Sequence, residues 1–296
     1  MAPRPRSYAS AEEDNARWAT FPFRRGDIVI STRSKHGTTW MQMICALLVF
    51  RTPDLPAPLG ELSPWLDRLT EPKDELFARL AAQTHRRFLK THTPLDGLPI
   101  VPQATYIVVA RHPLDAAVSL YHQGENIDRG VLRRLVGLPP DDAPPAPRPG
   151  LHDWLMEWIE DDPAPTESLD SLPGVMWHLT DAWGRRSQPN ILLVRYDDLE
   201  RNLEGAMREL AARLRIEVDE PTWPALVRAA SFSAMRAEAE SVLPDRNGVL
   251  KDPAAFFRRG TSGAAREVLS TSELGRYEDR ARHLGPAGLL EWLHRM

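Results

Sequence analysis

The stretch of residues 31–40 carries side chains suited to binding an anion. Lys35 offers positive charge, Gly37 lets the backbone approach a ligand closely, and Thr38 and Thr39 offer hydroxyl groups. A short apolar run precedes the stretch and a longer proline-free apolar run follows it, which predicts a strand, a loop and a helix. Helix N-termini attract phosphate-like groups, so this is a candidate phosphate-binding loop. An ordinary capped helix start would have a similar composition.

The order of residues in this loop differs from that of a Walker A loop. In a Walker A loop the lysine directly follows the second glycine. Here Lys35 precedes Gly37, which disfavours a nucleoside triphosphatase.

A second candidate site follows the next predicted strand, residues 87–90. Lys90 ends that strand, His92 comes two residues later, and Pro94 fixes the exit of the loop. Ligands of open parallel sheets bind at the carboxyl ends of the strands. His92 is therefore a candidate general base for a hydroxyl substrate, although a histidine seen alone is more often structural or exposed.

Two further sites are cationic. Arg111 follows the clearest strand and Ser119 lies on the helix predicted after it, so the two could grip one phosphate. Arg258 and Arg259 precede Gly260 in a segment rich in aromatic residues and glycine, which suits a loop closing over a phosphate. Taken alone, each site would more often be a solvated surface group.

The elements that must position these sites alternate between strand and helix. We predict strands over residues 27–31, 87–90, 104–110 and 191–194, and helices over residues 37–50, 114–123, 196–214 and 286–294. Such alternation indicates a single α/β domain over residues 1–296, with a central parallel sheet flanked by helices. Residues 51–64 read as a loop.

Residues 125–185 are expected to form a variable helical cap or lid. The proline-rich residues 139–147 cannot form regular structure, which indicates a lid, a binding loop or a disordered segment. Trp154, Trp158, Trp177 and Trp183 fall on predicted helices, where core packing is the commoner role for a tryptophan.

Composition narrows the class of protein. The net charge is −4, so a nucleic-acid partner is not expected. The single cysteine, Cys45, lies in an apolar run and reads as a core residue. We find no apolar run long enough to span a membrane and no secretory signal, so a cytoplasmic enzyme is expected. There is no convincing metal-ligand cluster, and no metal cofactor is expected.

The four sites, in this order, resemble the sulfotransferase family that uses 3′-phosphoadenosine 5′-phosphosulfate as donor. The likeness runs from about residue 27 to about residue 263. It implies a fold like that of P-loop nucleoside triphosphate hydrolases, with a P-loop-like phosphosulfate-binding loop and a helical acceptor cap. The stretches 63–67 and 88–97 look most like bacterial glycolipid sulfotransferases, which implies a small-molecule or glycolipid hydroxyl acceptor.

The resemblance also implies roles for individual residues. His92 matches the catalytic base, Lys35 matches the lysine that stabilises the leaving phosphate oxygen, and Lys90 matches the lysine beside the base. The positions that match donor-binding residues are Lys35, Gly37, Thr38, Thr39, Trp40, Arg111, Ser119, Tyr196, Phe232, Met235, Arg258, Arg259 and Gly260.

The sequence departs from the family pattern at several positions. His36 stands where animal cytosolic members usually have serine, and Ala230 stands where threonine is common. The short dimerisation motif is poorly kept around residues 266–273, so the oligomeric state stays open.

Two other readings stay open at this point. A non-catalytic phosphonucleotide-binding protein of the same fold would have no need of a base at His92. A small-molecule kinase would need a proper Walker A loop and acidic magnesium ligands, and neither is evident.

Overall fold

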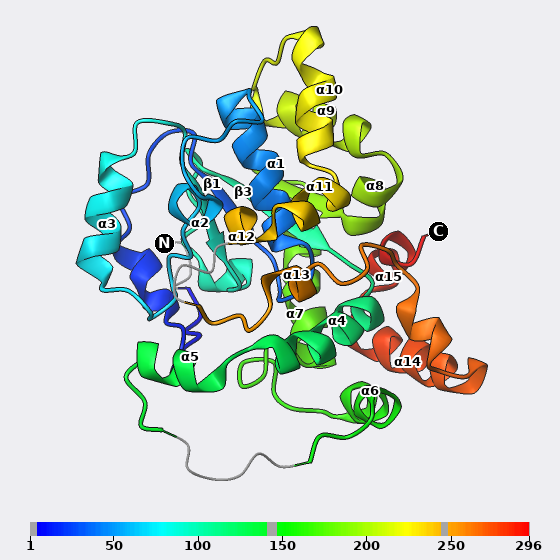
Figure 1. Cartoon of the computed structure of the whole chain (residues 1–296). Coiled ribbons are helices and arrows are strands. Elements are labelled where there is room, and N and C mark those ends of the chain that lie inside the picture. Colours follow the sequence, from blue (N-terminus) through cyan, green and yellow to red (C-terminus); the bar gives the residue numbers. More distant parts are fainter. Residues whose placement is uncertain (1–4, 141–146, 244–247, 296) are drawn as a thin grey trace.

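A four-stranded parallel sheet forms the centre of the computed structural model, which describes residues 5–140, 147–243 and 248–295 (Figure 1). The strand order is β2-β1-β3-β4. The strands are β1 (Ile28–Ser31), β2 (Phe88–Thr91), β3 (Thr105–Ala110) and β4 (Ile191–Arg195). Each confirms a predicted strand to within one residue at either end.

Fifteen α-helices and four short 3₁₀ helices surround the sheet in the described ranges. The helices of the first half are α1 (Thr38–Phe50), α2 (Leu59–Leu62), α3 (Lys73–Ala82), α4 (Pro113–Asn126), α5 (Arg129–Leu135), α6 (Leu151–Glu160) and α7 (Leu172–Arg185). Those of the second half are α8 (Tyr196–Arg201), α9 (Leu203–Leu214), α10 (Trp223–Ala229), α11 (Phe232–Ala237), α12 (Ala239–Val242), α13 (Pro253–Phe256), α14 (Thr271–Leu284) and α15 (Ala287–Leu293). The 3₁₀ helices are η1 (Asn15–Thr20), η2 (Leu95–Gly97), η3 (Glu220–Thr222) and η4 (Ala264–Glu267). None of the described helices is long and apolar enough to cross a lipid bilayer.

Both faces of the sheet are covered, because alternate side chains of each strand point to opposite faces. Val29 of β1 belongs to a core shared with α4, α6, α7, α14 and α15. Ile28 and Ile30 belong to the core on the other face, with α1, α9 and α10. All three side chains are fully buried, as their continuous apolar run predicts for a parallel sheet.

The register of the strands brings the candidate sites to one edge. Ser31 at the end of β1 lies opposite Thr91 at the end of β2, and Ala110 at the end of β3 lies opposite Arg195 at the end of β4. Because all four strands run parallel, the loops that follow them leave at the same edge of the sheet.

The structure corrects the expected helices at two places. The single helix predicted over residues 196–214 is two helices, α8 and α9. The chain breaks at Asn202, which has φ −148° and ψ 76° and accepts a hydrogen bond from the Gly205 N–H as the N-cap of α9. The loop expected over residues 51–64 contains the short helix α2, which begins after Pro58.

The expected cap region is mostly helical and not a separate layer. Residues 129–135 form α5, while α6 and α7 pack into the core beside the sheet. The proline-rich residues 141–146 lie outside the described residues. The four tryptophans of this region lie on α6 and α7, as predicted.

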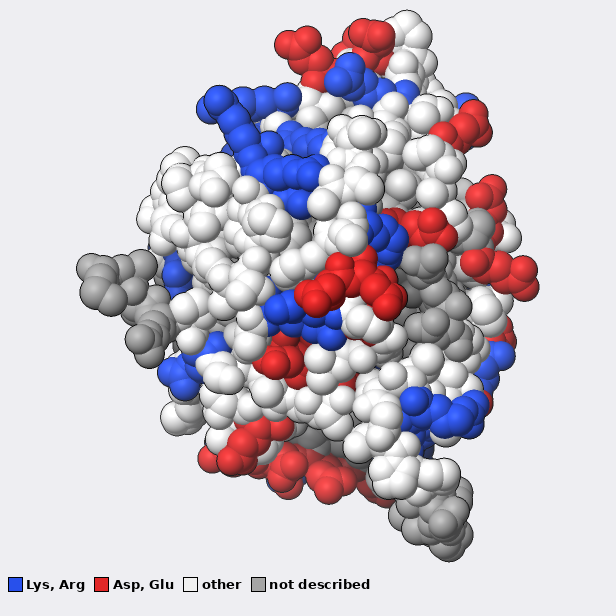
Figure 2. Space-filling view, turned by 90° about the vertical axis from the view of Figure 1, so that its left-hand side faces the viewer, with Lys and Arg blue, Asp and Glu red and all other residues white. Residues whose placement is uncertain are grey.

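The surface on the side of α3 has mixed charge. Figure 2 shows separate groups of lysine and arginine and of aspartate and glutamate side chains, with uncharged residues between them, over the described part of this face. No single sign of charge dominates this view.

A buried ion pair joins β1 and β2 at the edge opposite the candidate sites. Arg87 Nε donates to Asp27 Oδ1 at 2.9 Å and Arg87 Nη2 to Asp27 Oδ2 at 2.5 Å, and both side chains are at most 2% exposed. Arg87 Nη2 also donates to the Pro22 carbonyl oxygen. A buried charge that loses its partner is strongly unfavourable.

We therefore predict that Asp27→Ala lowers the free energy of unfolding by about 3–5 kcal/mol, because it leaves the buried Arg87 guanidinium without its counter-ion. Chemical denaturation of the purified protein measures this. The double variant Asp27→Ala, Arg87→Met should recover part of the loss, since no unpaired charge remains. Equal stability of the single and double variants would contradict the argument.

Candidate active site

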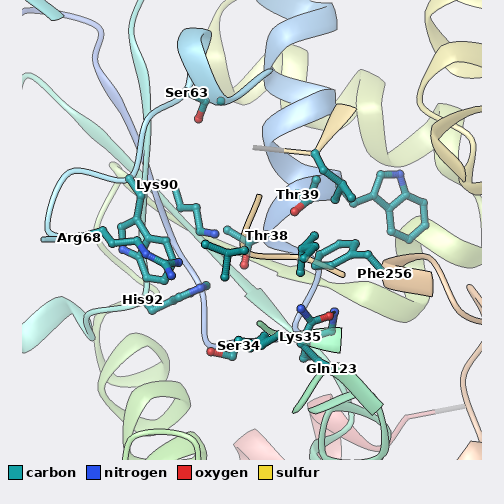
Figure 3. A pocket seen from close by; sticks show the side chains of 18 of the residues that line it. Ser34, Lys35, Thr38, Thr39, Ser63, Arg68, Lys90, His92, Gln123 and Phe256 are labelled. Atoms are coloured by element: carbon teal, nitrogen blue, oxygen red, sulfur yellow. Dashed lines mark hydrogen bonds between the residues drawn. The ribbon is translucent and has the colours of Figure 1, made fainter. Parts of the chain in front are cut away.

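A cavity of about 770 Å³ opens at the carboxyl edge of the sheet (Figure 3). Every residue for which the resemblance implied a catalytic or donor-binding role lines the cavity: Lys35, Gly37, Thr38, Thr39, Trp40, Lys90, His92, Arg111, Ser119, Tyr196, Phe232, Met235, Arg258, Arg259 and Gly260. Lys90, His92 and Arg68 gather on one side of the cavity, and Lys35, Gln123 and Phe256 on the other, with Thr38 between them. Four separate loops thus build one site.

The loop before α1 has the backbone that the sequence requires. Gly37 is the N-cap of α1 with φ 94°, in the left-handed region that favours glycine. A Cβ atom at this position would lie 2.9 Å from Tyr196 Cδ2, so no larger residue fits. No side chain caps α1, which leaves its first N–H groups open to a ligand.

The side chain of Lys35, from the same loop, is held by residues of α4 and α13. Its Nζ donates to Gln123 Oε1 at 3.1 Å and lies 3.7 Å from the centre of the Phe256 ring. Burial, with the nearby positive charges of Arg111 and Lys90, lowers the pKa of Lys35 to about 7. No sequence motif predicted Gln123 or Phe256 as partners of Lys35.

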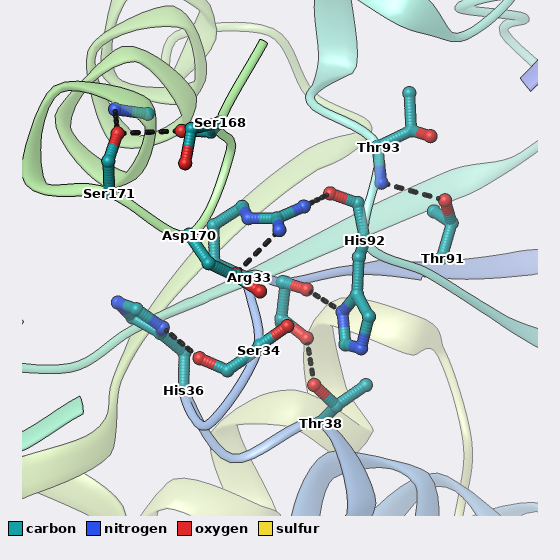
Figure 4. A network of polar contacts seen from close by, with 12 residues as sticks. Arg33, Ser34, His36, Thr38, Thr91, His92, Thr93, Ser168, Asp170 and Ser171 are labelled. Atoms are coloured by element: carbon teal, nitrogen blue, oxygen red, sulfur yellow. Dashed lines mark hydrogen bonds and ion pairs between the residues drawn. The ribbon is translucent and has the colours of Figure 1, made fainter. Parts of the chain in front are cut away.

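His92 has the tautomer that a general base needs (Figure 4). Its Nδ1 hydrogen-bonds the Thr32 carbonyl oxygen, which can only accept, so Nδ1 carries the proton and Nε2 keeps a lone pair. Burial and the charge of Lys90 hold the pKa of His92 well below its usual value. Thr32 Oγ1 also hydrogen-bonds Thr38 Oγ1, so one residue connects the base to the phosphate-binding loop.

Arg33 fixes the loop that carries His92. Its Nη1 donates to the His92 carbonyl oxygen and its Nη2 to Asp170 Oδ1 at 2.6 Å, and its side chain is 5% exposed. Arg33 belongs to no motif recognised in the sequence, because its partners come from β2 and the segment before α7.

Trp65 contacts His92 and two of the cations beside it. Its ring lies edge-on to the His92 ring, with centroids 4.5 Å apart. Lys90 Nζ lies 4.1 Å and the Arg68 guanidinium 4.5 Å from the Trp65 ring centre. Burial and the charge of Arg68 lower the pKa of Lys90 to about 7.

Aromatic residues form the opposite end of the cavity. Trp40 and Tyr196 meet edge to face at 5.1 Å, and the Trp40 Nε1–H donates to the Ala230 carbonyl oxygen at 2.8 Å. Gly260 has φ 69°, and a Cβ there would lie 2.5 Å from the Phe232 ring. This end offers a flat, apolar platform of the kind that binds a nucleobase.

The three arginines that match donor-binding positions differ in what they have to offer an anion. Arg111 donates to the Lys35 carbonyl oxygen at 3.2 Å and stacks 4.4 Å from the Tyr196 ring centre. Among the described residues, neither its buried Nε nor that of Arg258 has a hydrogen-bond partner. Arg259 instead makes two hydrogen bonds to Glu267, at 2.8 and 2.5 Å. Arg111 and Arg258 are therefore better placed to bind an anion.

His36 points away from the cavity. It is fully buried, its Nδ1 donates to the Ser34 carbonyl oxygen at 2.9 Å, and burial lowers its pKa to about 4. A neutral side chain outside the cavity wall gives no second base.

The expected cap region contributes little to the cavity. In the expected cap region, Ile127, Leu132 and Asp170 are the described residues that line the cavity, and none of its four tryptophans does. Within the described residues no group of three or more histidine, cysteine, aspartate or glutamate side chains could hold a metal ion.

Comparison with known proteins agrees with this geometry. The family model for the sulfotransferase domain matches residues 25–293. The chain is 38% identical to a glycolipid sulfotransferase of Mycobacterium bovis, over 97% of this chain and 93% of that protein. A glycolipid sulfotransferase of Mycobacterium tuberculosis gives the same identity and coverage.

Solved structures share the fold at lower identity. A mouse sulfotransferase complexed with PAP has a TM-score of 0.69 and 19% identity, covering 95% of this chain and 93% of that chain. Retinol dehydratase in complex with retinol and PAP has a TM-score of 0.68 and 21% identity, covering 91% of this chain and 84% of that chain. With the family match over most of its length, the chain belongs to the sulfotransferase family.

Proposed function

We propose that this enzyme transfers a sulfuryl group from 3′-phosphoadenosine 5′-phosphosulfate to a hydroxyl of a glycolipid acceptor. The observation that carries the proposal is the tautomer of His92, whose basic Nε2 belongs to the same cavity as the cations Lys35 and Lys90. The two structural neighbours bind PAP (3′-phosphoadenosine 5′-phosphate), which is the donor without its sulfuryl group, and this supports the identity of the donor. The names of the mycobacterial relatives support the acceptor class.

The donor's charge would be met by separate groups of this chain. Arg111, Ser119 and Arg258 would bind the 3′-phosphate, while Trp40 and Tyr196 would flank the adenine. The N-terminus of α1 and Lys35 would bind the phosphosulfate. The donor supplies the sulfuryl group and leaves as 3′-phosphoadenosine 5′-phosphate.

The residues at the centre of the cavity would carry out the transfer. His92 Nε2 accepts the proton of the acceptor hydroxyl as its oxygen bonds to sulfur. The bond from sulfur to the bridging phosphate oxygen breaks in the same step, and charge grows on that oxygen. Lys35, with Lys90 and the α1 N-terminus, stabilises this charge, and such preorganised stabilisation is commonly the largest catalytic contribution.

We predict that His92→Ala lowers kcat by about 100-fold or more, the usual contribution of a general base. The assay is transfer of labelled sulfuryl to hexyl β-glucoside, and PAP should still raise the melting temperature of the variant. His283→Ala, at an exposed histidine, is the control and should keep normal activity. Near-normal turnover of the His92→Ala protein would refute the assignment of the base.

The two arginines of the last cationic loop should differ in effect. Arg258→Ala should weaken PAP binding by about tenfold to a hundredfold, the value of a charged hydrogen bond. Arg259→Ala should change it by less than about threefold, because Glu267 already neutralises this guanidinium. Titration calorimetry with PAP measures both. Equal losses in the two variants would contradict the distinction.

A further inference from the structure

The cavity contains a carboxylate, that of Glu13, for which the described residues provide no hydrogen-bond or ion-pair partner. Glu13 lines the cavity with Trp65, Arg68, Lys90 and His92. Within the described residues its carboxylate makes no hydrogen bond or ion pair, whereas the neighbouring Asp170 is paired with Arg33. None of the four sites identified in the sequence includes this residue.

The backbone holds Glu13 rigidly in this position. The segment around it runs antiparallel to residues 67–69, with Glu13 opposite Arg68. The Asp14 N–H donates to the Asp67 carbonyl oxygen and the Leu69 N–H to the Glu12 carbonyl oxygen, both at 2.8 Å.

The same contacts tie Glu13 to the loop of the base. The Asp67 carboxylate accepts hydrogen bonds from Thr91 Oγ1 at 2.5 Å and Thr93 Oγ1 at 2.7 Å, on either side of His92. The position of Glu13 is therefore fixed relative to the atom that takes the proton.

The electrostatic surroundings of Glu13 fit an unsatisfied acceptor. Burial and the charge of Asp67 raise the pKa of Glu13 to about 7, against the opposing effect of Arg33. The charge of Glu13 in turn raises the pKa of Lys90, so the two groups are within electrostatic reach. A carboxylate held this way gains from a neutral hydroxyl donor that replaces lost water.

Part of the cavity wall is apolar. Ile127, Leu132, Leu243, Val249 and Leu250 line the same cavity. An acceptor that fills both parts has several hydroxyl groups near the base and a hydrocarbon portion beyond them.

We propose that Glu13 is a specificity-determining residue, accepting a hydrogen bond from a second hydroxyl of the acceptor while His92 deprotonates the first. The enzyme would then prefer a sugar headgroup to an acceptor with a single hydroxyl. A site built to hydrogen-bond a hydroxyl rejects analogues that lack it, because its buried polar group is left unpaired. This inference rests on the proposed function.

The test compares two probes with the same alkyl chain, hexyl β-glucoside and 1-hexanol. Calorimetry measures their binding to the full-length protein saturated with PAP, and kcat/KM is measured with the sulfuryl donor. The wild-type protein should bind the glucoside more tightly. Glu13→Ala should weaken glucoside binding and lower its kcat/KM by about tenfold or more, the cost of a lost hydrogen bond to a charged group. The values for hexanol should be unchanged or improved.

Two further variants exclude a general structural effect. Glu13→Gln keeps an acceptor oxygen and should fall between the wild type and Glu13→Ala. Glu75→Ala removes an exposed carboxylate that also lines the cavity and should leave the ratio between the probes unchanged. PAP should stabilise all these proteins equally.

The outcomes separate this inference from the proposed function. Two results would show that Glu13 does not bind a second hydroxyl. In one, the wild-type protein does not prefer the glucoside; in the other, Glu13→Ala changes the affinity and kcat/KM for both probes by the same factor. If the glucoside binds in a Glu13-dependent way but no sulfuryl group is transferred, the proposed function fails while the role of Glu13 stands.

Discussion

The burial of several cations in one cavity is the constraint on which the rest of this structure depends. Lys35, Lys90, Arg111 and Arg258 line the cavity, and within the described residues none of them forms an ion pair. Burial and mutual repulsion lower the pKa of both lysines to about 7. The repulsion among these cations destabilises the empty protein and is relieved when a polyanion binds. Functional sites commonly lower the stability of a protein in this way. The parallel sheet brings three of these side chains together, because Lys90 lies near the end of β2 while Lys35 and Arg111 follow β1 and β3.

The same environment decides the role of His92. Burial among positive charges keeps its imidazole neutral, and the Thr32 carbonyl oxygen fixes the proton on Nδ1. The proton on Nδ1 leaves the Nε2 lone pair of His92 available to accept a proton, as the proposed mechanism requires. Thr32 also contacts Thr38, so one residue just after β1 touches both His92 and the loop that we propose binds the donor. Family membership and this geometry point to the same chemistry from independent directions.

The sequence predicted the strands closely, because continuous β-branched apolar runs such as residues 105–109 leave little choice of structure. It also predicted which residues gather in the cavity, because motifs that follow parallel strands must meet at one edge. It could not reveal Glu13 or Arg68, since both reach the cavity through pairing of loops that carry no motif. Nor could it show that Glu267 neutralises Arg259, or that Asn202 ends one helix and caps the next, because these depend on side-chain contacts made in the folded chain.

Proton uptake on PAP binding tests most directly whether the cavity holds its buried lysines at a lowered pKa until a polyanion binds. At pH 8 lysines with a pKa of about 7 are mostly neutral, and a bound polyanion raises their pKa, so binding should take up protons. Calorimetric titrations with PAP in two buffers of different ionisation enthalpy measure this number. We expect net proton uptake, an affinity for PAP that falls as the pH rises from about 6.5 to about 8.5, and a smaller proton uptake in Lys35→Met. Binding with no proton uptake at pH 8, or no binding of PAP at all, would contradict it.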